Sequence, residues 1–175
     1  MPDKYSSFAV LARHQIEGQD YRILFRKRNG ARVIIAPHGG GIEPGTTEIA
    51  DAIAGNDLSF YAFEGIKTRG NGILHVTSSR FDEPQCIGLV QASPVAVSIH
   101  GEDSRERIVF VGGLHAETLT RIRAALALRG FRVENHANPL LRWPLPHRHG
   151  ACRCRVDLRL HGQRPFAEAG TLPAG

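Results

Sequence analysis

The chain has 175 residues, of which 42% are hydrophobic and 22% are charged. This composition is that of a globular protein with one substantial core, and it excludes a disordered or fibrous chain. The net charge is +5, but the segment from residue 142 onward carries +4 of it, because six arginines there face only two acidic residues. The rest of the chain is nearly neutral, which disfavours nucleic acid as a partner of the core.

The sequence also bears on location and assembly. It contains no apolar run of about 18 residues, so we expect no membrane-spanning segment. Residues 1–7 lack the apolar stretch of an export signal. The three cysteines, two of them in Cys152-Arg153-Cys154, do not make a disulfide framework. We therefore expect a cytoplasmic protein in a reducing setting, and we expect a monomer.

The first third of the chain predicts a helix, a hairpin and a second helix. Residues 4–17 carry apolar side chains at helical intervals. Residues 21–27 alternate apolar and basic side chains, which indicates a strand, and Asn29-Gly30 is a turn signal before a second strand at 32–36. We therefore predict a hairpin over 21–36. Thr46 or Thr47 can cap the helix that follows, which Gly55 closes.

The rest of the chain alternates strands with helices. Several strands are apolar on both faces, which predicts an α/β fold of three layers, with a mixed, mainly parallel sheet flanked by helices. We place this single domain at residues 1–142 and interpret 143–175 as a divergent basic segment that completes the sheet in part. The predicted strands are 58–63, 73–77, 95–99, 108–111 and 131–133, and the predicted helices start at Asp82-Glu83-Pro84 and span 114–129.

Metal-competent side chains lie where two of these strands end. His38 and Glu43 leave a glycine-rich turn after strand 32–36, and His100 follows strand 95–99. Ligands of α/β sheets bind at the carboxyl ends of strands, and zinc binds imidazole nitrogen and carboxylate oxygen. The three residues could therefore hold a zinc ion. On spacing alone two alternatives stay open: a turn that binds phosphate at the helix N-terminus, and a His38 that only hydrogen-bonds its own loop.

A set of longer motifs adds to this interpretation. These are His38–Ala50, Leu74–Ser78, Phe81–Pro84, Val97–Gly101 and Val111–Leu114. Together they resemble the phage-type poly-γ-glutamate hydrolases, whose members are often labelled phage-related replication proteins. The resemblance runs from about residue 3 to residue 141. It implies a fold like a compact zinc carboxypeptidase, Zn²⁺ held by His38, Glu43 and His100, and internal cleavage of an anionic γ-glutamyl polymer.

The chain departs from that family after residue 142. The family's last motif is a strand with a catalytic glutamate, in a context like Gly-Val-Gln-Leu-Glu-Leu. The nearest match in this chain places Asp157, one methylene shorter, at the glutamate position. A general base must come within hydrogen-bonding distance of the proton that it takes, so the shortening matters. A frameshift near Arg142 and ordinary divergence are both open explanations of the changed composition.

Two further residues are candidate substrate contacts. Arg80 can pair bidentately with a carboxylate, and His75 stands on a predicted strand that could end near the site, although it could equally be a hydrogen-bonded core residue. We therefore predict a zinc-dependent hydrolase of poly-γ-glutamate with Asp157 as its base, released with phage lysis. The alternatives are a zinc-binding homologue with impaired catalysis and a phage replication-associated nucleic-acid-binding protein. An aromatic content of 7% disfavours the last of these.

Overall fold

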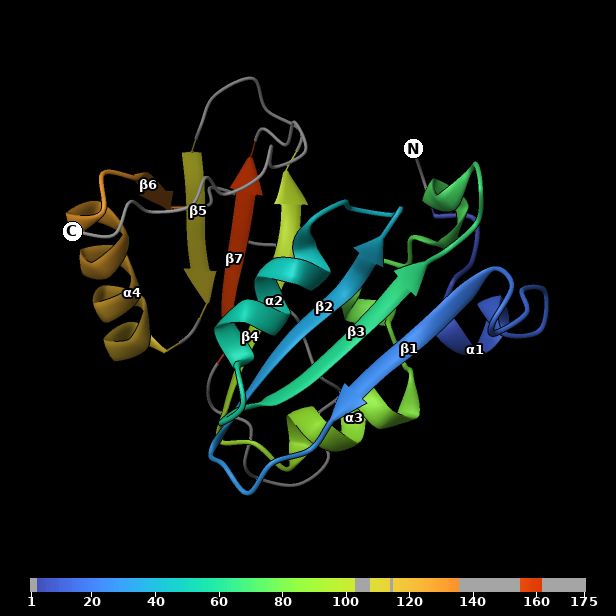
Figure 1. Ribbon diagram of the computed structural model, residues 1–175, viewed down its shortest axis with the longest axis horizontal. Coiled ribbons are helices and arrows are strands. Elements are labelled where there is room, and N and C mark those ends of the chain that lie inside the picture. Colours follow the sequence, from blue (N-terminus) through green and yellow to red (C-terminus); the bar gives the residue numbers. More distant parts are fainter. Residues whose placement is uncertain (1–2, 103–107, 114, 136–154, 162–175) are drawn as a thin grey trace, which may run out of the picture.

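A mixed sheet runs through the whole molecule (Figure 1). The computed structural model describes residues 3–102, 108–113, 115–135 and 155–161. In these ranges the sheet has seven strands in the order β1-β3-β2-β4-β7-β5-β6. Only the β1–β3 and β5–β7 pairings are antiparallel. The strands are β1 (Tyr21–Arg26), β2 (Arg32–Gly40), β3 (Ser59–Gly65), β4 (Val95–Glu102), β5 (Ile108–Gly113), β6 (Arg132–Asn135) and β7 (Arg155–His161).

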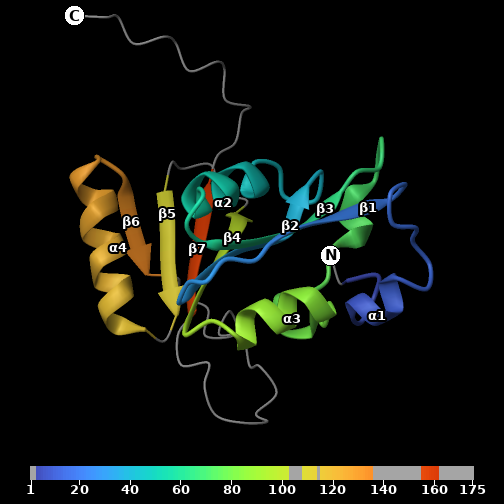
Figure 2. The ribbon, with the colours of Figure 1, turned by 60° about the horizontal axis from the view of Figure 1, so that its bottom comes forward.

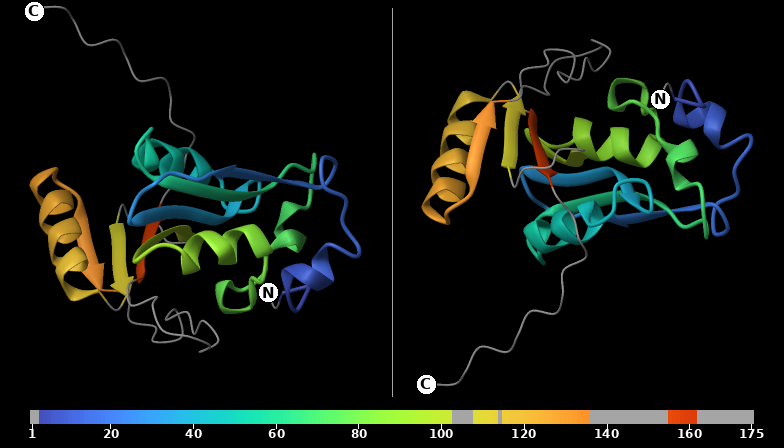
Figure 3. Two further views of the ribbon diagram at one scale, coloured as in Figure 1. Left: turned by 90° about the horizontal axis from the view of Figure 1, so that it is seen from below. Right: turned by 90° about the horizontal axis from the view of Figure 1, so that it is seen from above.

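Helices cover the sheet on both faces, as Figures 2 and 3 show. Side chains of α1 and α3 pack in a core cluster on one face, and side chains of α2 and α4 pack with a second cluster on the other. The predicted three-layer α/β fold with a mixed, mainly parallel sheet is thus confirmed. The helices are α1 (Phe8–Leu11), α2 (Thr46–Ala54), α3 (Pro84–Gln91) and α4 (Ala116–Leu128), and the short 3-10 helices are η1 (Asn71–Leu74) and η2 (Ser78–Arg80).

The two core clusters meet in β2, which is apolar on both faces. Val33 and Ile35 belong to the cluster under α1 and α3, whereas Ile34 and Ala36 belong to the cluster under α2. Alternate residues of a strand point to opposite faces, so an uninterrupted apolar run serves both layers. Burial of each large apolar side chain contributes about 1.5–3 kcal/mol, which fixes β2 in the interior of the sheet.

The predicted hairpin over residues 21–36 is wrong. β1 pairs antiparallel with β3, and β2 runs parallel to β3 on its other side. The Asn29-Gly30 turn therefore joins two strands that are not neighbours in the sheet. Burial explains the arrangement: β1 exposes part of its side chains and takes the edge, while the buried β2 lies between β3 and β4.

Two other predicted elements differ from the structure. The helix expected over 4–17 is confined to α1. The strand expected over 73–77 is the end of η1 followed by a loop, in which Asp3 bonds the His75 side chain and the Thr77 backbone in place of a neighbouring strand. At the start of α3 the cap is Glu83, whose buried carboxylate accepts hydrogen bonds from the backbone N–H groups of Gln85 and Cys86.

The remaining predicted strands and helices agree with the structure to within a few residues. β7 comes from the segment that we interpret as divergent, and it lies between β4 and β5. The division of the chain at residue 142 stays a prediction. In the described ranges, no helix combines the length and the apolar character needed to cross a membrane.

Candidate metal centre

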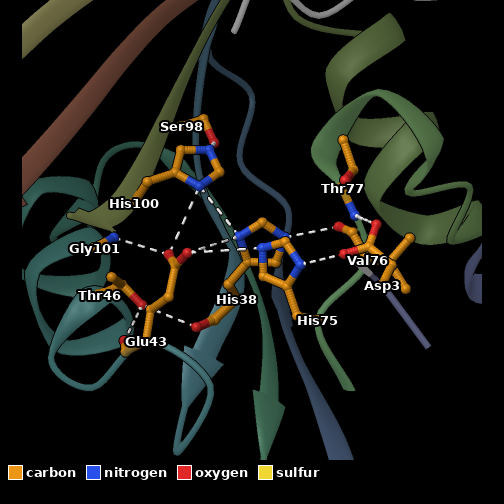
Figure 4. Close-up of polar contacts among 10 residues, drawn as sticks. All are labelled: Asp3, His38, Glu43, Thr46, His75, Val76, Thr77, Ser98, His100 and Gly101. Atoms are coloured by element: carbon orange, nitrogen blue, oxygen red, sulfur yellow. Dashed lines mark hydrogen bonds and ion pairs between the residues drawn. The ribbon is translucent and has the colours of Figure 1, made fainter. Parts of the chain in front are cut away.

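Three of the sequence-predicted side chains converge beside the ends of β2 and β4 (Figure 4). His38 lies in the last part of β2, His100 lies in β4, and Glu43 follows in the turn before α2. The Nδ1 atoms of the two histidines are 3.2 Å apart. The Glu43 carboxylate oxygens lie 3.3 Å from Nδ1 of His38 and 3.7 Å from Nδ1 of His100.

These separations suit a zinc ion. With zinc–ligand bonds of about 2.0–2.1 Å in a tetrahedral shell, neighbouring ligand atoms are about 3.3–3.4 Å apart. The contacts between His38, His100 and Glu43 lie close to that value. Two imidazole nitrogens and a carboxylate oxygen are also a donor set that zinc prefers, so the residues present fit this metal.

Hydrogen bonds on the far side of each ring turn Nδ1 inward. Nε2 of His38 is 2.8 Å from the carbonyl oxygen of Val76. A carbonyl only accepts, so Nε2 carries the proton and neutral His38 presents an unprotonated Nδ1. Nε2 of His100 lies 2.7 Å from the Ser98 hydroxyl, which can accept a proton or donate one and so suits either tautomer. Such partners fix a ligating histidine ring in its orientation.

Glu43 is held by backbone groups on both sides. Its own N–H donates to the carbonyl oxygen of His38 at 2.8 Å, and its Oε2 accepts from the Gly101 N–H at 2.8 Å. A β-carbon at position 101 would lie only 3.1 Å from the Glu43 Cβ, so glycine allows this close approach. Burial raises the pKa of Glu43, but contacts with His100 and His38 outweigh burial and hold the pKa well below its ordinary value. The carboxyl group is therefore ionised at neutral pH.

A third histidine, His75, stands at the rim of this cluster. Its ring stacks on His38 with centroids 4.2 Å apart, and its Nε2 lies 4.0 Å from Oε1 of Glu43. Its Nδ1 lies 2.7 Å from Oδ1 of Asp3. Burial and the neighbouring His38 lower the pKa of His75, against the opposing effect of Asp3. His38, Glu43 and His75 also form a group whose possible ligand atoms all lie within 4.8 Å of one another.

The other two sequence-predicted site residues lie elsewhere or can be placed only along the chain. Arg80 ends η2 and is exposed, and in the described ranges it makes no hydrogen bond or ion pair with the clustered side chains. Asp157 lies in β7, where its backbone is in register with Ser98 on β4 and Gly112 on β5. The roles predicted for Arg80, His75 and Asp157, and the three-residue metal site, stay predictions.

Sequence reasoning missed two residues that support the cluster. Ser98 and His100 stand two apart on one strand, a spacing that puts both side chains on one face, so Ser98 could have been found from the alternation of the strand. Asp3 lies 72 residues from His75, and nothing in the sequence connects the two.

Comparison with known proteins gives both a family and a fold. The sequence profile of the family described as poly-gamma-glutamate hydrolase matches residues 5–147. The chain is 39% identical over 132 residues to the SPbeta prophage-derived protein YoqZ of Bacillus subtilis (strain 168), covering 75% of this chain and 47% of YoqZ. This chain thus spans about half the length of the curated relatives it matches.

Two solved structures are similar to this one. A bacteriophage poly-gamma-glutamate hydrolase superposes with a TM-score of 0.81 at 29% identity, over 91% of this chain and 79% of the other. The zinc-free apo form of YndL superposes with a TM-score of 0.78 at 26% identity, over 91% and 80% of the two chains. The sheet and its flanking helices are therefore those of a zinc-peptidase-like fold, and the chain belongs to the poly-gamma-glutamate hydrolase family.

Proposed function

We propose that this protein is a zinc-dependent hydrolase that cleaves the γ-glutamyl amide bonds of poly-γ-glutamate. The observation that carries the proposal is the convergence of His38, His100 and Glu43 at separations that suit one tetrahedral ion. The family supports the choice of substrate. The zinc-free description of the similar YndL structure supports the choice of metal.

His38 and His100 would hold the ion through Nδ1, and Glu43 through its carboxylate. A zinc ion held there would supply Lewis acidity, which lowers the pKa of a water molecule to about 7 and polarises a carbonyl group. The backbone bonds of Val76 and Gly101 keep the His38 ring and the Glu43 carboxylate in place. Preorganisation of this kind lowers the cost of reaching the transition state.

Asp157 is the proposed general base. Its backbone stands beside that of Ser98, two residues before His100 on the neighbouring strand. The carboxyl group of Asp157 would take a proton from water and pass it to the leaving amine nitrogen. Since it replaces a family glutamate and is one methylene shorter, Asp157→Glu is the variant that tests the role most directly.

The substrate carries a carboxylate on each unit and an amide in each link, so cationic and hydrogen-bonding groups would bind it. We assign this task to Arg80, whose exposed guanidinium can form two parallel hydrogen bonds with a carboxylate, and to His75 at the rim. We expect the anionic polymer to be the partner of this protein, and we expect the protein to act on it as a monomer.

Depolymerisation of poly-γ-glutamate by the purified, mass-verified protein tests the proposal. Chain shortening with zinc that a chelator abolishes is the expected result, and His38→Ala should remove it while the matched exposed variant His14→Ala should not. If the protein binds zinc without cleaving the polymer, and Asp157→Glu restores cleavage, the protein is the zinc-binding homologue with impaired catalysis. If His38→Ala kept full activity, the proposed metal centre would be refuted.

A further inference from the structure

We propose that Asp3 is a positioning residue: it fixes the His75 ring so that Nε2 faces the candidate metal centre and accepts a hydrogen bond from a substrate amide N–H. This inference rests on the proposed function for the identity of the substrate, a γ-glutamyl amide. The juxtaposition itself, between the start of the chain and the loop after η1, does not depend on it.

Asp3 binds that loop through both carboxylate oxygens. Oδ1 lies 2.7 Å from Nδ1 of His75, and Oδ2 accepts a hydrogen bond of 2.7 Å from the backbone N–H of Thr77. The side chain of Asp3 is only 8% exposed. Figure 4 shows this carboxylate on the side of the His75 ring that faces away from Glu43. Two hydrogen bonds to one ionised carboxylate hold the carboxylate, and with it the ring, more firmly than a single contact would.

The same geometry fixes what His75 can recognise. A carboxylate only accepts, so Nδ1 of His75 is the protonated nitrogen and Nε2 of the neutral ring is an acceptor. An acceptor takes an N–H donor and does not bind a carboxylate. His75 is thereby suited to the amide group of the polymer backbone, whereas the side carboxylates of the polymer need a cation such as Arg80.

Exposure places His75, and not the other two rings, within reach of a substrate. Its side chain is 36% exposed, against 3% for His38 and 2% for His100. Its Nε2 lies 4.0 Å from Glu43, farther than the 3.2–3.7 Å that join the atoms of the proposed metal site. His75 therefore lies beside that site, on its open side, and not within its three-residue shell.

A second aspartate provides a matched control. Asp82 also fastens the segment that follows Asp3, by accepting a 3.0 Å hydrogen bond from the backbone N–H of Ala9 through its Oδ1. In the described part of the chain, Asp82 makes no hydrogen bond or ion pair with His75. A merely structural role for Asp3 would make Asp3→Asn and Asp82→Asn behave alike.

The test combines ring ¹⁵N NMR of His75 with steady-state kinetics on γ-glutamyl oligomers, in the full chain with zinc. We expect wild type and Asp82→Asn to show the Nδ1–H tautomer. In Asp3→Asn the new amide can donate to Nδ1, so we expect a shift toward the Nε2–H tautomer. The value of kcat/KM should fall about 10- to 100-fold in Asp3→Asn and Asp3→Ala, as for other residues that orient a site histidine, with zinc stoichiometry unchanged.

The outcomes separate this inference from the proposed function. Unchanged His75 signals in both Asp3 variants would overturn the positioning role even if the wild type cleaves the polymer. A tautomer shift confined to the Asp3 variants, in a protein that does not cleave poly-γ-glutamate, would support positioning and refute the hydrolase proposal. An oligomer with an N-methylated scissile amide, bound as tightly as its parent by the wild type, would refute recognition of the N–H group.

Discussion

The half of the sheet that contains β2 and β3 is packed more tightly than the half that α4 covers. Every residue of β3 is buried, and so are seven of the nine residues of β2. In the half that contains β5 and β6, the covering helix α4 has no buried side chain in the described part of the chain, and its Leu128 is 85% exposed. The candidate metal centre lies in the tightly packed half, where β2 carries His38 and β4 carries His100. A metal site tolerates errors of only about 0.5 Å, so it needs supports that cannot shift.

The largest effect should follow from damage to the centre itself. His38→Ala removes one of the three proposed metal donors, and loss of the several kcal/mol that a metal supplies would correspond to about a thousandfold lower activity. We expect the variant to fold, because Leu74 and Val76 stay buried in the core cluster. Zinc titration by calorimetry and depolymerisation kinetics measure the two losses, and retention of wild-type zinc affinity would contradict the assignment.

The second prediction compares the stability that the two halves of the sheet contribute, through one residue of β3 and one of α4. Phe63 is fully buried among aromatic rings, whereas Leu128 is largely exposed. Phe63→Ala should lower the free energy of unfolding by about 3–5 kcal/mol. Leu128→Ala should change it by less than about 0.5 kcal/mol. Urea unfolding of both variants checks the contrast, and similar losses would mean that α4 is as well packed as β3.

The sequence predicted features that depend on local residue patterns, and it did not predict features that depend on contacts between distant segments. Apolar runs such as Val33–Ala36 indicate buried strands, so most of the strands and helices were predictable. Pairing was not, because the Asn29-Gly30 signal describes only a local turn, while the choice of β3 as the partner of β1 depends on distant burial. In the site, the informative signal was the position of His38 and His100 at the ends of apolar strands, because the structure brings both side chains beside Glu43. The spacing of His38 and Glu43 alone is a weak pattern. The support from Asp3 was not predictable, since it arises only when chain segments far apart in sequence meet.

A third prediction concerns acid stability of the zinc-free protein. The pKa of Glu43 is lowered in the folded state, so below the ordinary glutamate pKa of about 4.3 the unfolded chain binds more protons than the folded one. The stability contributed by Glu43 is therefore present above that pH and is lost as the pH falls. Glu43→Gln should flatten the decline in unfolding free energy below pH about 5, whereas Glu48→Gln, an exposed neighbour, should not.

The smallest effects should come from two glycines. In Gly101→Ala the new β-carbon would approach Glu43 to 3.1 Å, so we expect zinc affinity to fall about tenfold, within the range seen when supports of a metal ligand are disturbed. In Gly88→Ala, on α3, no atom lies within 4 Å of the new β-carbon, and alanine should stabilise the helix by about 0.5–1 kcal/mol. Thermal unfolding and zinc titration of both variants would show whether the two glycines differ in this way.

The place of β7 bears on how the chain folds as it is synthesised. β7 is made after the six other strands of the described ranges, yet it lies between β4 and β5 and pairs with both. While the ribosome is still extending the chain, β4 and β5 each have an unpaired edge, and the β5–β6 pair has no strand to dock on. Open edges of this kind are sites where nascent chains associate with one another. The strand that pairs with the His100 segment of β4 is therefore in place only after β7 has emerged.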